Sequence, residues 1–196
     1  MMERKFNSRV LVLLLFMVLI IGLRVIAPLS PDFKVIANFS GIGAVALFGG
    51  AYFKNNINAF LLPVLILFLS DLGLALTMGK DYGFYSGWYY TYIAFILMVL
   101  VGKLTLKKVN VQHVIGAGLI AVFIHWIISD YGVWLGSTVY PQTFAGFWEC
   151  LVLAIPYEKN FLYSTLGYSA LMFGLFESLK IKYTVLDLKS NPTVKA

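Results

Sequence analysis

Long uninterrupted runs of apolar residues constrain this chain more than any other feature of its sequence. A helix that crosses the hydrocarbon core of a bilayer needs about 20 such residues. Six runs come close to that length, so the sequence predicts an all-α integral membrane protein with six transmembrane helices; five and seven remain as alternatives. The expected spans are 10–27, 35–53, 57–78, 88–106, 114–135 and 161–179.

Composition agrees with this prediction and excludes several other classes of protein. Apolar residues make up 60% of the 196 residues and charged residues only 12%, whereas a soluble domain carries about 25% charged residues. The formal charge of +6 is explained by loop lysines and arginines of a membrane protein, so no nucleic-acid partner is expected. The single cysteine, Cys150, excludes an internal disulfide. We find no catalytic motif, metal-ligand spacing or phosphate-binding loop, and expect no enzyme, metal or cofactor.

The positions of lysine and arginine predict how the chain is oriented. Basic residues collect on the cytoplasmic side of membrane proteins. An arrangement with both termini in the cytoplasm (N-in/C-in) places far more of them inside than outside. The inner ends would hold Arg4, Lys5, Arg9, Lys54, Lys103, Lys107, Lys108, Lys180, Lys182, Lys189 and Lys195, and the outer loops Lys34, Lys80 and Lys159.

The stretch 136–160 separates the fifth and sixth spans and is long for a loop in a compact domain. It contains an apolar core that is too short to span a membrane, with Pro141 before it and Pro156 after it. We therefore expect a short interfacial helix that stops near Pro156 and covers the outer opening of a binding site as a lid. The alternative is an interfacial belt. The whole chain, 1–196, is expected to form one membrane domain with a cytoplasmic tail at 180–196.

Several polar residues fall within or next to the outer halves of the spans. Ionisable groups at membrane depth are costly and usually serve a function, so these residues are candidates for binding a substrate. Each has a structural alternative: Arg24 could reach the outer surface or pair with Asp71, His125 could bond a neighbouring helix, and Asp130 could bond water. The candidates of this kind are Arg24, Asn38, Asp71, His125 and Asp130.

Aromatic residues gather on the same predicted outer side. An aromatic belt at the membrane surface would explain some of them, but a belt would be expected on both faces, and tryptophan is missing from the inner ends. A pocket lined by aromatic and a few polar groups is a common form of small-molecule site. The further candidates after the fifth span are Trp134, Tyr140, Trp148 and Glu149.

Some local motifs resemble a known family. The family consists of small bacterial membrane proteins of unknown function that carry only a general transport label, and the similarity covers roughly residues 20 to 178. Two positions differ, because the family usually has proline where Gly41 stands and asparagine where Asp130 stands. The motifs are Asn38-Phe39-Ser40-Gly41-Ile42-Gly43-Ala44, Leu47-Phe48-Gly49-Gly50-Ala51-Tyr52-Phe53, Leu62-Pro63, Ser70-Asp71, Tyr131-Gly132-Val133-Trp134, Tyr140-Pro141 and Ala154-Ile155-Pro156.

That family in turn resembles the S components of energy-coupling-factor transporters, which capture vitamins with six helices. The resemblance implies a multi-pass protein of the bacterial cytoplasmic membrane that takes up a vitamin-like or cofactor-like molecule through an outward-facing pocket. S components that dock on a shared energising module often carry Ala-x-x-x-Ala in span one, and residues 10–26 contain no alanine. The expected partners are therefore the substrate and the bilayer, with an energising module or another membrane subunit as open possibilities. The alternatives are an assembly subunit of a larger membrane complex and, third, a membrane enzyme.

Overall fold

The computed structural model describes residues 8–29 and 40–187, and it is all-α, with no strand among the described residues. Two 3₁₀ turns, η1 (Ala27–Leu29) and η3 (Thr184–Leu186), follow the first and last helices. The helices are α1 (Ser8–Ile26), α3 (Ile42–Tyr52), α4 (Asn56–Met78), α5 (Lys80–Gly83), α6 (Trp88–Thr105), α7 (Val111–Gly136) and α8 (Phe144–Lys182).

Within the described residues, four helical stretches are long and apolar enough to cross a membrane, which indicates a membrane protein. They are Ser8–Ile26, Asn56–Met78, Lys80–Thr105 and Val111–Gly136. They match the expected spans one, three, four and five, and they confirm the prediction of apolar membrane helices. The remaining two expected spans correspond to α3 and to the second part of α8.

Helix α3 lies at the centre of the bundle. It has only 11 residues, and all of them except Ala51 are buried. It packs against α1, α4, α6, α7 and α8. Small residues make this possible: a Cβ on Gly50 would collide with the Val99 carbonyl of α6, and a Cβ on Gly102 would collide with the Leu47 backbone of α3. The backbones of α3 and α6 are therefore in direct contact along this seam, as small residues at helix interfaces allow.

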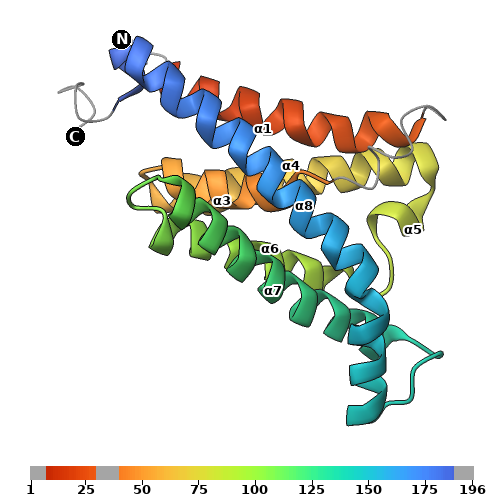
Figure 1. The fold of residues 1–196 in the computed structure, drawn as a ribbon. Coiled ribbons are helices and arrows are strands. Elements are labelled where there is room, and N and C mark those ends of the chain that lie inside the picture. The colour runs from red at the N-terminus through yellow and green to blue at the C-terminus, as the bar shows by residue number, and fades with distance from the viewer. Residues whose placement is uncertain (1–7, 30–39, 188–196) are drawn as a thin grey trace.

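Helix α8 corrects the prediction made for residues 136–160. The expected short helix ending at Pro156 is wrong, because α8 continues for 39 residues with Pro156 inside it. Figure 1 shows α8 bending in its N-terminal part and then crossing the bundle towards the start of α1. A proline removes one backbone hydrogen bond and bends a helix, but neighbouring helices allow a membrane helix to continue through it.

The two ends of the bundle hold different residues, and we name them here. The cavity end carries the C-termini of α1, α4 and α7 and the N-termini of α3, α6 and α8. The lysine end carries the opposite termini, including those of α6 and α8 with Lys103, Lys180 and Lys182. At the lysine end the Arg9 guanidinium donates to the Leu186 carbonyl and, at 3.1 Å, to the Tyr52 carbonyl. These bonds fasten η3 and α3 to α1.

Candidate functional site

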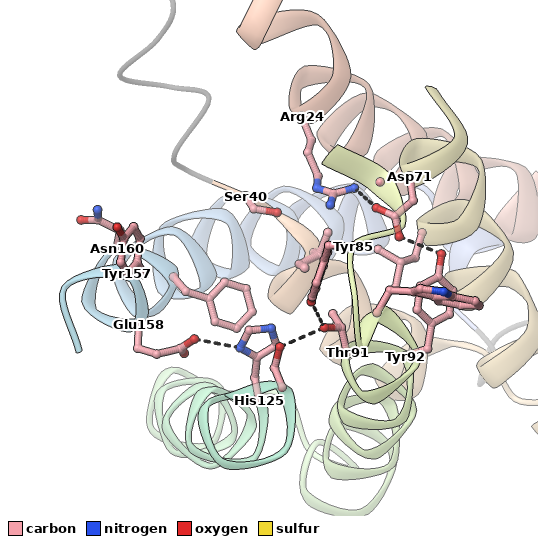
Figure 2. A pocket seen from close by; sticks show the side chains of 16 residues that line it. Arg24, Ser40, Asp71, Tyr85, Thr91, Tyr92, His125, Tyr157, Glu158 and Asn160 are labelled. Atoms are coloured by element: carbon pink, nitrogen blue, oxygen red, sulfur yellow. Dashed lines mark hydrogen bonds and ion pairs between the residues drawn. The ribbon is translucent and has the colours of Figure 1, made fainter. Parts of the chain in front are cut away.

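A cavity of about 320 Å³ lies at the cavity end of the bundle. Its walls come from all the α-helices described here, including the first residue of α3, and from Ser40 just before α3 and Tyr85 just before α6. Figure 2 shows two polar groups on different sides of it, with Tyr85 and Thr91 between them. This volume falls at the lower end of the range for small-molecule pockets.

The first polar group joins α1, α4 and α6. An Arg24 guanidinium nitrogen lies 2.5 Å from one carboxylate oxygen of Asp71, and the Tyr92 hydroxyl donates to the other at 2.7 Å. Arg24 also donates to the Ser70 hydroxyl. The Asp71 side chain is only 5% exposed, so both its oxygens are bonded in a setting where an unpaired charge would be costly. The pairing of Arg24 with Asp71, weighed from the sequence as a structural alternative, is present.

The second polar group joins α7 and α8. The His125 ring nitrogen Nδ1 lies 3.1 Å from Oε1 of Glu158, and both side chains are 14% exposed. The His125 ring also packs against Phe161, with ring centroids 4.4 Å apart. The other carboxylate oxygen of Glu158, Oε2, is buried and has no hydrogen-bond partner. Glu158 therefore brings an unsatisfied acceptor to the cavity wall.

A set of hydroxyl groups lies between these two polar groups (Figure 2). The Tyr85 and Thr91 hydroxyls are hydrogen-bonded to each other, and Thr91 is hydrogen-bonded to Ser129 of α7 at 2.9 Å. The Ser40 hydroxyl, which also lines the cavity, is buried without a partner. Since buried polar atoms are normally hydrogen-bonded, the Ser40 and Glu158 oxygens mark places where a bound molecule could supply the missing bond.

The structure brings three of the residues proposed from the sequence together. Arg24, Asp71 and His125 all line the cavity. Asn38 lies outside the described residues. Asp130 is next to the cavity-lining Ser129 in the chain but is not itself among the lining residues; its carboxylate oxygen Oδ2 is buried without a partner.

The other four candidates lie away from the cavity wall. Trp134 holds the connection between α7 and α8, because its indole nitrogen donates to the Pro141 carbonyl at 2.8 Å. Trp148 is 51% exposed, and Glu149 is also exposed, while Tyr140 is half-buried. Residues 136–156 contribute no cavity-lining residue, whereas Tyr157, Glu158 and Asn160, at the end of the segment expected to form a lid, do line the cavity.

Two important wall residues, Glu158 and Tyr92, were not among the candidates from the sequence. In the sequence, Glu158 lies in the stretch before the last apolar run, and Tyr92 lies within an aromatic stretch that a membrane belt explains equally well. A signal for Glu158 was available, because an acid on the sixth helical segment at the depth of His125 is a natural partner for it. Recognising that partnership required knowing that α7 and α8 are adjacent.

The arrangement suits binding better than metal coordination. No group of three or more His, Cys, Asp or Glu side chains that could hold a metal ion is found in 8–29 or 40–187. The charged side chains that line the cavity are paired with each other, and hydroxyl and aromatic groups make up much of the remaining wall. Such a wall is able to hold a small molecule that has both rings and hydrogen-bonding groups.

Fold and cavity together define a helical membrane protein with an internal polar cavity at one end. Residues 4–187 match the model of a family of unknown function, DUF6580, and the chain belongs to that family. No curated protein and no solved structure is significantly similar to it. The family match agrees with the resemblance to an uncharacterised family.

Proposed function

We propose that this protein spans the bacterial cytoplasmic membrane six times, with both termini inside, and takes up a small molecule that it binds from the outer side. The cavity carries this proposal. It lies at the end of the bundle opposite to the lysine end, and lysine-rich ends face the cytoplasm. The cavity would then lie in the outer half, where a molecule arriving from outside is captured.

The unsatisfied oxygens of the cavity wall indicate what kind of molecule it binds. Glu158 Oε2 and the Ser40 hydroxyl have no hydrogen-bond partner. The carboxylate oxygen is able to accept a hydrogen bond, and the hydroxyl is able to accept or donate one. Trp88 and Tyr92 form an edge-to-face pair on the wall, with ring centroids 5.0 Å apart. The proposed ligand is therefore a ring compound that presents N–H donors, such as an amino-substituted heterocycle. This chemistry is compatible with the vitamin-like or cofactor-like substrates that the resemblance implies.

The first experiment identifies the ligand and tests the role of Glu158. Small molecules that copurify with the protein are extracted and identified by mass spectrometry, for the wild type and for Glu158→Gln. The glutamine keeps the shape but lacks the carboxylate charge, so we expect at least about a tenfold loss of the bound compound, in line with the loss of a charge-assisted hydrogen bond.

The matched control is Glu149→Gln, because Glu149 lies on the same helix, is exposed and does not line the cavity. It should retain the compound at the wild-type level. Uptake of the identified compound by cells is then measured with and without the protein. If no compound copurifies and uptake is unchanged, the proposal fails and the alternative of an assembly subunit is favoured.

A separate experiment tests the orientation. With Cys150 replaced by serine, a single cysteine at position 107 should be protected from a membrane-impermeant thiol reagent on intact cells. A cysteine at position 80, the first residue of α5 at the cavity end, should react. Labelling of position 107 from outside would contradict the N-in/C-in orientation.

Whether the protein works with an energising module or alone is part of the same proposal. Purification in a mild detergent under conditions that preserve complexes answers this question. Copurification of an ATPase would favour a module of the energy-coupling-factor type, as the resemblance suggests. Uptake that persists in cells without such ATPases would favour a transporter that acts alone.

A further inference from the structure

A second hollow lies at the lysine end, between the start of α7 and the C-terminal half of α8. It measures about 490 Å³, and we call it the α7–α8 groove. Its walls are almost entirely apolar; Val114, Ile115 and Phe173 are typical members. Val111 at its margin is 75% exposed, as expected for a residue that faces lipid.

The length of the groove matches one leaflet of a bilayer. Along α8 it extends from Leu166 to Glu177, which at 1.5 Å per residue corresponds to about 16 Å. The hydrocarbon core of a bilayer is about 30 Å thick, so one leaflet accounts for about 15 Å. An acyl chain that enters at the lysine end would therefore lie along the full length of the groove.

The charged groups near the groove leave its mouth positive. Glu177 is the charged residue of the wall, and its carboxylate accepts hydrogen bonds from Lys180 at 2.9 Å and from the Tyr52 hydroxyl at 2.5 Å. Its charge is therefore compensated within the protein. Lys107 and Lys108 immediately precede the wall residue Val109, and both are exposed.

We propose that the α7–α8 groove binds an anionic phospholipid of the cytoplasmic leaflet, with an acyl chain in the groove and the phosphate at Lys107 and Lys108. The hydrocarbon of the bilayer is as apolar as the groove, so the groove alone cannot choose one lipid over another. Lys107 and Lys108 can distinguish between lipids, because positive side chains near the membrane surface attract anionic headgroups. The occupant is thus selected by its headgroup and held in place by its chain.

This site uses neither the cavity at the other end nor the proposed transport function; its assignment to the cytoplasmic leaflet rests on the proposed orientation. The two hollows share no wall residue. A failure of the ligand experiment on Glu158 would therefore leave the lipid site untouched, and a failure of the lipid experiment would leave the cavity untouched.

The test uses the full-length protein in nanodiscs made from equal amounts of phosphatidylglycerol and phosphatidylcholine with identical acyl chains. The protein is extracted gently, and the phospholipid that stays bound is measured by native mass spectrometry. The wild type should retain phosphatidylglycerol preferentially. Each lysine near an anionic headgroup contributes roughly a fivefold preference, so K107Q/K108Q should lower the selectivity by at least about tenfold.

A charge-matched control separates this effect from a change in net charge. The variant K80Q/K159Q removes two exposed lysines that lie away from the groove, and it should keep the wild-type selectivity. Equal retention of the two lipids by the wild type, or the same loss of selectivity in both double variants, would overturn the proposal.

Filling the groove provides a second, independent test. Gly174 lines the groove, and a Cβ at this position meets no atom within 4 Å, so Gly174→Leu places a side chain in the groove without a clash. Gly167→Leu is the control, because Gly167 is also exposed on α8 with open space around its Cβ but lies outside the groove.

Gly174→Leu should retain at least about tenfold less phospholipid than the wild type, whereas Gly167→Leu should retain the wild-type amount. Should Gly174→Leu fail to give a monodisperse protein, Ala170→Leu fills the same groove and replaces it. Retention at the wild-type level in a filled and folded variant would disprove the site, as would a copurified polypeptide in place of the phospholipid.

Discussion

The two ends of the helix bundle are built largely from the same helices, but one end is densely packed and the other contains a cavity. At the lysine end, Phe48, Tyr52 and Phe176 interlock with ring centroids 4.5 to 5.5 Å apart, and Phe48 and Phe176 are fully buried. At the cavity end, polar side chains from several helices surround about 320 Å³ of open space. Dense aromatic packing supplies the contact energy of the fold, and this allows the other end to keep a space that a ligand could occupy.

The difference has a simple physical basis. Aromatic rings fill volume and need few hydrogen bonds, so they pack closely around the short central helix α3. Charged and hydroxyl groups must instead find partners when they are buried. Arg24 with Asp71 and His125 with Glu158 satisfy one another across helices, which joins α1 to α4 and α7 to α8 around the cavity. The comparison leads to three predictions.

The largest effect is expected where α3 and α6 touch at the packed end. In Gly50→Leu the new side chain would meet the backbone of α6 at Val99, and backbone atoms cannot move aside without separating the two helices. We expect a loss of about 3 kcal/mol or more in the free energy of unfolding, measured by denaturation in detergent. Gly116→Leu is the control, because a Cβ on Gly116 meets nothing within 4 Å and should leave stability unchanged. Equal stability of both variants would contradict the close seam between α3 and α6.

A smaller effect is expected at the pair of Arg24 and Asp71 in the cavity wall. Asp71→Asn leaves the Arg24 guanidinium without its ion partner, and removing one member of a buried pair costs several kcal/mol. Because the Arg24 side chain is 19% exposed, solvent reduces the expected loss to about 2 kcal/mol. The double variant Arg24→Gln with Asp71→Asn should recover most of the stability, measured by the same denaturation. A stable Asp71→Asn that loses the copurified ligand would instead show that Asp71 contacts the ligand.

The smallest effect is expected outside the cavity, at Trp148. This side chain is 51% exposed and does not line the cavity. Trp148→Ala should therefore leave the dissociation rate of the ligand identified by mass spectrometry unchanged within about a factor of two, measured by chase with unlabelled compound. A large increase in that rate would support the lid interpretation of residues 136–160, because it would show that the first turns of α8 take part in retaining the ligand.

Much of the fold could be predicted from the sequence because apolar run length fixes the membrane helices. The expected spans 57–78, 88–106 and 114–135 lie within three residues of α4, α6 and α7 at each end. The local rule that proline stops a helix failed at Pro156, because packing against other helices outweighs the loss of one hydrogen bond. The expected span 35–53 begins outside the described residues, and within them its helix, α3, runs from Ile42 to Tyr52.

The membrane depth of the candidate site residues could be predicted from the sequence, but the hydrogen-bond partners of these residues could not. The sequence places Arg24, Asp71 and His125 at one side of the membrane, and the structure gathers these three around one cavity. Glu158 and Tyr92 could not be assigned, because their roles depend on which helices are neighbours. The aromatic candidates from the end of α7 onwards do not line the cavity; Trp134 instead donates a hydrogen bond to the Pro141 carbonyl in the connection to α8.

Helix α8 runs from one end of the bundle to the other and is the longest helix in the part of the chain that the structure describes. Its 39 residues correspond to about 58 Å of helix. Pro156 precedes every cavity-lining residue of α8, from Tyr157 to Phe161. Glu158 in the cavity wall and Glu177 at the lysine end lie on this same helix. A tilt of α8 caused by a ligand at Glu158 would therefore move the Glu177 carboxylate, which accepts hydrogen bonds from Tyr52 and Lys180 at the other end of the bundle.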